Sequence, residues 1–122
     1  MIQLLVALAG GLGAVARFLV DAEIGRRASR APLPLGTVVI NVSGSLLLGL
    51  VTGWWSVHTG DPDVRSLLGL GFLGGYTTFS TACVEAARLA GAGRAWSVLA
   101  HVAGMLVLSV AAAGLGFWLG GL

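Results

Sequence analysis

The sequence predicts an all-α membrane protein with four transmembrane helices, the third of which is interrupted. Of its 122 residues, 57% are hydrophobic and 10% are charged, whereas an average soluble domain is about 25% charged. The mean hydropathy is +0.94. Because a helix needs about 20 mostly apolar residues to cross a bilayer, four such stretches use nearly the whole chain. A soluble fold and an additional soluble domain are therefore excluded.

The four expected spans form a single transmembrane domain, residues 1–122. They cover approximately residues 2–20, 33–57, 67–87 and 95–122. The first stretch lacks the positively charged segment and small-residue cleavage site of a secretory signal. We therefore expect it to be retained as a helix.

The arginines predict the orientation of the chain. The second connection carries one arginine, Arg65. The first and third connections together carry five: Arg26, Arg27, Arg30, Arg88 and Arg94. The first connection ends in Pro32-Leu33-Pro34, which separates two helices. The excess of arginine places these two connections in the cytoplasm and both termini outside. Since the basic residues flank helices, they indicate topology rather than a nucleic-acid partner.

Glycines predict close helix packing. Three pairs have the G-x-x-x-G spacing: Gly49/Gly53, Gly71/Gly75 and Gly116/Gly120. In lipid, small residues let helix backbones approach closely. We expect a compact bundle that forms an oligomer, because four short helices enclose little space for a pathway.

The third span contains the strongest functional signal. Gly74 and Gly75 are followed by Thr77 and Thr78, which are poor helix formers in the middle of a membrane span. This composition predicts a break, and freed backbone carbonyls there can bind a cation. The hydroxyls and ring edge that follow suit a small anion: Phe79, Ser80 and Thr81. The alternative is a kinked packing helix whose hydroxyls bond to their own backbone.

Four other polar residues within the expected spans are candidates for a function. Asn41 is either a hydrogen-bonding link between helices or part of a pathway. Glu85 is a functional candidate, or else the partner of Arg88 at i, i+3. His101 and Ser109 are eight residues apart, share a helix face and could continue a polar track, although a structural role is the better explanation of His101 alone. Nothing predicts an enzyme, because no nucleophile, base and orienting group occur together.

Three ordered motifs with matching spacing give the chain a resemblance to the fluoride channel family, also called Fluc or CrcB. They are residues 10–17 (GGLGAVAR), 34–44 (PLGTVVINVSG) and 71–81 (GFLGGYTTFST). The resemblance implies an antiparallel, dual-topology dimer in the bilayer of the cell (inner) membrane, with two fluoride pores. It also implies a central structural sodium ion (Na⁺), which backbone carbonyls of Gly74 and Thr77 hold and which is not transported.

The resemblance further implies a passive fluoride efflux that lowers the cytoplasmic concentration. In the family, a helix-two Asn and a helix-three Phe line the route, matching Asn41 and Phe79. Family hydroxyls match Ser80, Thr81 and Ser109, the family acid matches Glu85, and a family tyrosine falls at His101. A second family Phe is replaced here by Ala82. This loss, with the arginine bias, leads to the hypothesis that the chain pairs with an oppositely oriented homologue rather than with itself.

Two other functions are consistent with four short helices. An exporter similar to the small-multidrug-resistance proteins needs a carboxylate in its first helix, and residues 2–20 contain no acid. A membrane assembly subunit that transports nothing leaves the combination of Asn41 and a broken helix unexplained.

Overall fold

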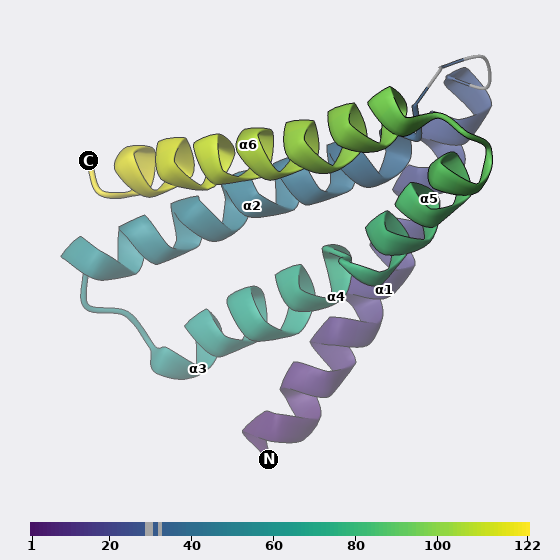
Figure 1. Ribbon diagram of the computed structural model, residues 1–122. Coiled ribbons are helices and arrows are strands. Elements are labelled where there is room, and N and C mark those ends of the chain that lie inside the picture. Colours follow the sequence, from purple (N-terminus) through teal and green to yellow (C-terminus); the bar gives the residue numbers. More distant parts are fainter. Residues whose placement is uncertain (29–30, 32) are drawn as a thin grey trace.

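The computed structural model describes residues 1–28, 31 and 33–122, and the regular structure of these residues is helical. Four segments are long and apolar enough to cross a membrane, which confirms the predicted number of spans. Three are continuous helices (Figure 1): α1 (Ile2–Arg27), α2 (Leu35–Val57) and α6 (Ala95–Gly120). The third span is composite: α3 (Pro62–Ser66), the π-helix η1 (Leu67–Leu73), α4 (Gly74–Tyr76) and α5 (Ser80–Gly91).

The first helix is longer than the predicted 2–20, because α1 continues to Arg27. Glu23 pairs with Arg26, and its Oε1 lies 2.5 Å from Nε of Arg27. Such i, i+3 and i, i+4 pairs support a helix in water, and cations near a helix C-terminus are favourable. The arginines therefore lie in the last turn of α1. Two other residues named for this connection, Arg30 and Pro32, lie outside the described residues.

The third span is also longer than the predicted 67–87. It begins at Pro62, where the Asp61 carboxylate accepts a hydrogen bond of 2.8 Å from the amide of Asp63. It ends at Gly91, and Gly93 then takes a φ of 72°, which glycine adopts without steric cost. These capping signals extend the span into polar sequence that hydropathy alone does not include.

Helices α2 and α6 run parallel and in close contact along their second halves (Figure 1). A Cβ on Gly49 would lie 2.2 Å from the carbonyl oxygen of Ala113, and one on Gly116 would lie 2.1 Å from that of Leu46. Each helix thus presents glycine to the backbone of the other. The close packing predicted from the G-x-x-x-G pairs of these two helices is confirmed.

Helix α1 packs in the same way against the first half of the third span. A Cβ on Gly75 would lie 2.0 Å from the carbonyl oxygen of Gly10, and one on Gly13 would lie 2.0 Å from that of Phe72. Two helix pairs thus form the fold, α2 with α6 and α1 with the first half of the third span, and α5 packs against α6.

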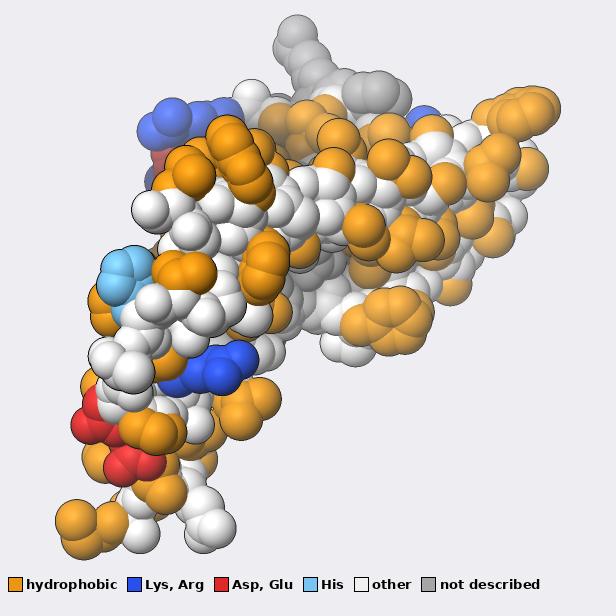
Figure 2. All heavy atoms as spheres, turned by 90° about the vertical axis from the view of Figure 1, so that its left-hand side faces the viewer, with side chains coloured by type: hydrophobic (Ala, Val, Ile, Leu, Met, Phe, Trp, Pro, Cys, Tyr) orange, Lys and Arg blue, Asp and Glu red, His pale blue; other side chains and the backbone are white. Residues whose placement is uncertain are grey.

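Few side chains are fully buried in a single chain. The buried hydrophobic residues are Ile40, Leu73, Ala82 and Leu89. Large apolar side chains are exposed along every span, and Figure 2 shows them spread over one end of the bundle, with charged side chains gathered in small groups. Such surfaces suit lipid or another membrane subunit rather than water.

Candidate functional site

The third span is interrupted at Thr77–Phe79, referred to below as the break. Helix α4 ends at Tyr76, Thr77 is extended (φ −76°, ψ 158°), and α5 begins at Ser80. The predicted break is confirmed, but it begins after the two glycines rather than at them. Gly75 is still helical, and its missing Cβ lets its backbone lie directly against that of Gly10 in α1.

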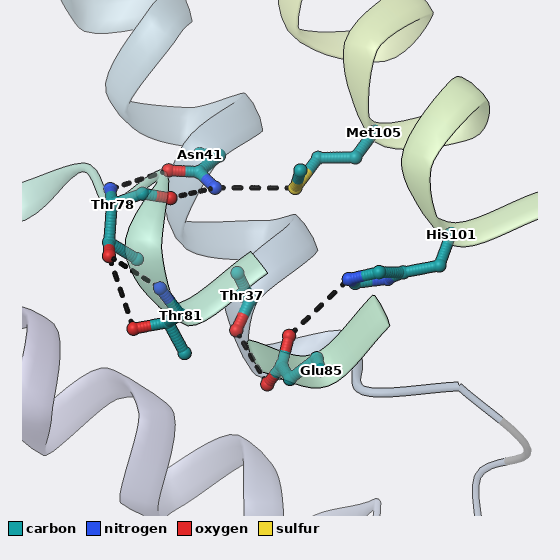
Figure 3. A network of polar contacts seen from close by, with 7 residues as sticks. All are labelled: Thr37, Asn41, Thr78, Thr81, Glu85, His101 and Met105. Atoms are coloured by element: carbon teal, nitrogen blue, oxygen red, sulfur yellow. Dashed lines mark hydrogen bonds and ion pairs between the residues drawn. The ribbon is translucent and has the colours of Figure 1, made fainter. Parts of the chain in front are cut away.

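Asn41 of α2 holds the break in place (Figure 3). Its Oδ1 accepts a hydrogen bond from the Thr78 amide and its Nδ2 donates to the Thr78 carbonyl, both at 2.8 Å. Nδ2 also lies 3.3 Å from Sδ of Met105 in α6, a weak acceptor. The carboxamide thus satisfies both backbone groups of Thr78. Of the two roles predicted for Asn41, the structure shows the link between helices.

The hydroxyl groups at the break form hydrogen bonds with backbone and hydroxyl groups of the same span. Thr77 Oγ1 donates to the Leu73 carbonyl at 3.0 Å. Thr78 Oγ1 accepts from the Thr81 amide at 3.3 Å and contacts the Thr81 hydroxyl at 3.1 Å and that of Ser80 at 3.3 Å. Thr78 Oγ1 therefore accepts from an amide in the first turn of α5, and Phe79 is the residue that directly precedes the helix.

The backbone carbonyls of Gly74 and Thr77 are among those that lose their usual helical donors at the break. In a continuous helix, Gly74 would accept from the amide of Thr78 and Thr77 from the amide of Thr81. Here the Thr78 amide bonds to Asn41 and the Thr81 amide bonds to Thr78 Oγ1. Gly74 and Thr77 both line two cavities on the surface of the chain. Freed carbonyl oxygens of this kind are ligands for a hard cation.

A cavity of about 530 Å³, here called the central cavity, lies between the break and helices α2 and α6. Polar groups from three segments face it, with the ring of Phe79 beside them. Phe79 is 82% exposed. Among the described residues, the buried Ser109 Oγ has no hydrogen-bond partner. The lining includes Asn41, Ser45, Thr78, Phe79, Met105 and Ser109.

A second polar group lies one to two turns beyond the break along α5 (Figure 3). Thr37 of α2 donates to Oε1 of Glu85 at 2.8 Å, and Nε2 of His101 in α6 lies 3.4 Å from Oε2 of Glu85. His101 is 1% exposed. Within the described part of the chain, Glu85 thus accepts one hydrogen bond, from Thr37, whereas its Oε2 and Nε2 of His101 have no hydrogen-bond partner. No ion pair between Glu85 and Arg88 is found among these residues.

Glu85 also lines a cavity of about 440 Å³, here called the vestibule, at the end of the bundle where α1 meets α2 and α5 meets α6. Its charged lining residues are Asp21, Glu85, Arg88 and Arg94. Of the two residues that could continue a polar track, His101 lies beside Glu85 and Ser109 lines the central cavity.

The comparison with known proteins decides the family. A family model described as CrcB-like protein, Camphor Resistance (CrcB), matches residues 4–117. The chain belongs to the CrcB family. A relative from Cutibacterium acnes, named fluoride-specific ion channel FluC 2, is 57% identical over 98% of both chains.

Further relatives of this CrcB chain carry the same description. Fluoride-specific ion channel FluC 1 of Leifsonia xyli is 54% identical over all of this chain and 88% of its own length. FluC 2 of Mycobacterium bovis is 43% identical over 93% of this chain and 86% of its own. CrcB proteins are ion channels rather than enzymes, which confirms the prediction that this chain is not an enzyme.

Sequence reasoning did not single out Thr37 or Met105. The partner of Thr37 is 48 residues away and that of Met105 is 64 residues away, so no local pattern links them. Their position on the helix faces that carry Asn41 and His101 is the one signal that the sequence offered.

Proposed function

We propose that this CrcB chain is a subunit of a multi-pass fluoride channel in the inner membrane, through which fluoride leaves the cytoplasm passively. The observation that carries the proposal is the break, which Asn41 supports beside a cavity lined by hydroxyls and an aromatic ring. The channel names of the relatives point in the same direction. An assembly protein without transport leaves the combination of Asn41 and the break unexplained.

The proposed pathway uses donors rather than positive charge. Fluoride is small and strongly hydrated, so fixed donors must replace its water during passage. Asn41, Phe79 and Ser109 line the central cavity, and the edge of an aromatic ring carries partial positive charge. Ser80 and Thr81 extend the hydroxyl surface along the start of α5, and Glu85 lies farther along the same helix beside the vestibule.

We propose further that a structural sodium ion is held at the break. The carbonyls of Gly74 and Thr77 have lost their helical donors and fit a hard cation that prefers oxygen. Two carbonyls from one chain are too few to replace the hydration of sodium, whereas two chains would supply four. The ion would stabilise the dimer and would not be transported.

The proposed assembly is an antiparallel dimer, either of two copies or of this chain and a homologue. The 82% exposed Phe79 and the 77% exposed Leu70 are available to a partner surface. Ala82, where the family carries a second ring, is 4% exposed and faces the chain's own helices. The missing ring and the arginine bias favour a homologous partner.

A small-multidrug-resistance-like exporter is less well supported. Helix α1 does contain Asp21 and Glu23, since it is longer than predicted. Both lie in its polar end, where Glu23 pairs with Arg26 and Arg27. The apolar part, Ile2–Val20, has no carboxylate that could carry protons at membrane depth.

Fluoride efflux from proteoliposomes tests the proposal. The purified chain is reconstituted alone and with a co-expressed CrcB homologue, and efflux is followed with a fluoride electrode, with chloride-loaded vesicles as the control. Efflux of fluoride but not chloride is expected. Efflux that occurs only when the chain is reconstituted together with the homologue would support the mixed dimer. No efflux in either case would refute the channel function.

A further inference from the structure

Both N–H groups of the Asn41 carboxamide already have partners. Nδ2 donates to the Thr78 carbonyl at 2.8 Å and lies 3.3 Å from Sδ of Met105 (Figure 3). The Thr78 amide donates to Oδ1, also at 2.8 Å. This bond fixes which end of the carboxamide is the nitrogen, because the reverse orientation would place donor against donor and acceptor against acceptor. An anion that reaches Asn41 therefore gains an N–H only where one of these partners gives way.

The two partners differ in how readily an anion can displace them. Loss of the bond to the Thr78 carbonyl would leave a backbone acceptor of the break without a donor, which is expensive. The sulfur of Met105 is an uncharged, weak acceptor, and a methionine side chain repacks easily because it is unbranched and flexible. A hydrogen bond to an anion is roughly twice as strong as a neutral one. The N–H that points at Met105 is therefore the one that fluoride can take.

Met105 is also in the right place for this exchange. It lines the central cavity together with Asn41 and Ser109. Ser109 lies four residues farther along α6 on the same helix face, and its buried Oγ has no hydrogen-bond partner among the described residues. When the sulfur moves aside, an N–H from α2 and a hydroxyl from α6 become available in one cavity. An ion that exchanges its water for fixed donors needs several of them together.

We propose that Met105 is a positioning residue of the fluoride pathway. Its sulfur occupies the second N–H of Asn41 while the cavity holds no ion, and it gives this N–H up when fluoride arrives. Between ions the contact keeps the carboxamide satisfied and in place against Thr78. This inference rests on the proposed fluoride channel and assigns one more residue to it.

Met105→Leu removes the acceptor and nearly keeps the volume of the side chain. Fluoride then has no competitor for the N–H, so the fluoride concentration that gives half-maximal efflux from proteoliposomes should fall about twofold to fivefold. This change corresponds to about 0.4–1 kcal/mol, the scale of one weak hydrogen bond. A purely structural role of Met105 would instead lower the maximal rate and leave the half-maximal concentration unchanged.

Leu108→Met is the matched control. It makes the reverse exchange on the same helix, at a side chain that is 52% exposed and lies outside the lining of the central cavity. The half-maximal fluoride concentration of this variant should equal that of the wild type. An equal fall in both variants would show that the Met105→Leu result does not come from the contact with Asn41.

A second measurement uses the wild-type channel and so does not depend on the folding of a variant. Asn41 is the one asparagine of the chain, and Met1 and Met105 are its two methionines. Labelling of asparagine with ¹⁵N and of the methionine methyl groups with ¹³C therefore gives NMR signals that belong to these residues alone. Sodium fluoride should shift the Met105 methyl signal and one of the two Nδ2 proton signals, whereas the Met1 methyl should not respond. Sodium chloride at the same concentration controls for ionic strength.

Two results would overturn the proposal. One is a half-maximal fluoride concentration in Met105→Leu that is unchanged or higher than in the wild type. The other is a Met105 methyl signal that fluoride does not shift more than chloride does. Both leave the fluoride channel intact as long as the wild type conducts fluoride. Wild-type vesicles without efflux, alone and with the homologue, would instead refute the channel function itself, and this inference with it.

Discussion

Replacing Asn41 with leucine tests whether this side chain holds the break. Leucine has a similar size but neither accepts nor donates, so the amide and the carbonyl of Thr78 lose their 2.8 Å partners together. An unsatisfied buried backbone group costs about 1–3 kcal/mol. Because unfolded states in a membrane environment also find partners, we expect a loss of about 2–4 kcal/mol in the free energy of unfolding, taken from the lower part of the range for two groups.

The assay is reversible unfolding in detergent micelles, with hydrogen exchange at the Thr78 amide as a local readout. The unfolding midpoint of Asn41→Leu should fall and the Thr78 amide should exchange faster. Ser45→Ala is the matched control, since Ser45 lies one turn away on the same helix and lines the same cavity. If Asn41→Leu abolishes efflux while its midpoint and the exchange at Thr78 equal those of the wild type, Asn41 acts on the ion and does not support the break.

Three further substitutions follow from the packing. Gly75→Ala places a Cβ 2.0 Å from the Gly10 carbonyl oxygen and should cost about 1–3 kcal/mol in unfolding; Gly104→Ala, with nothing within 4 Å, should be near neutral, and equal effects would contradict the contact. Phe79→Leu should lower efflux about fivefold to tenfold, the range that an aromatic edge supports. The unfolding midpoint of the single chain should not change, and a lowered midpoint would argue against a direct role of Phe79 in the pathway. Ala82→Phe should destabilise the chain by about 1–3 kcal/mol, and an increase in efflux would show that the ring reaches the pathway.

The sequence predicted the number of spans and the presence of a break, because both depend on local composition. It predicted the position of the break less well. Gly74 and Gly75 are poor helix formers, yet both lie in a helix that ends at Tyr76, and Gly75 packs there against α1. A tertiary contact here outweighs intrinsic propensity, and propensity gives no information about the neighbouring helix.

The neighbours of a polar residue depend on its position along the helix axis as well as on the helix face that carries it. His101 and Ser109 do share a face of α6, but eight residues separate them by about 12 Å. They therefore meet different neighbours, Glu85 in one case and the central cavity in the other. The contact between Thr37 and Glu85 joins residues 48 positions apart, and no local sequence pattern predicts such a pairing.

The break also constrains how the protein enters the membrane during synthesis. Helix α5 has 12 residues, and the preceding segments α3, η1 and α4 have 5, 7 and 3, whereas about 20 are needed to cross a bilayer. Neither half of the third span is therefore a stable insertion unit by itself. Asn41, which binds the backbone between the halves, is on α2, and α2 is synthesised before the third span. The order of the helices along the gene thus ensures that the interrupted span emerges beside a helix that can receive it.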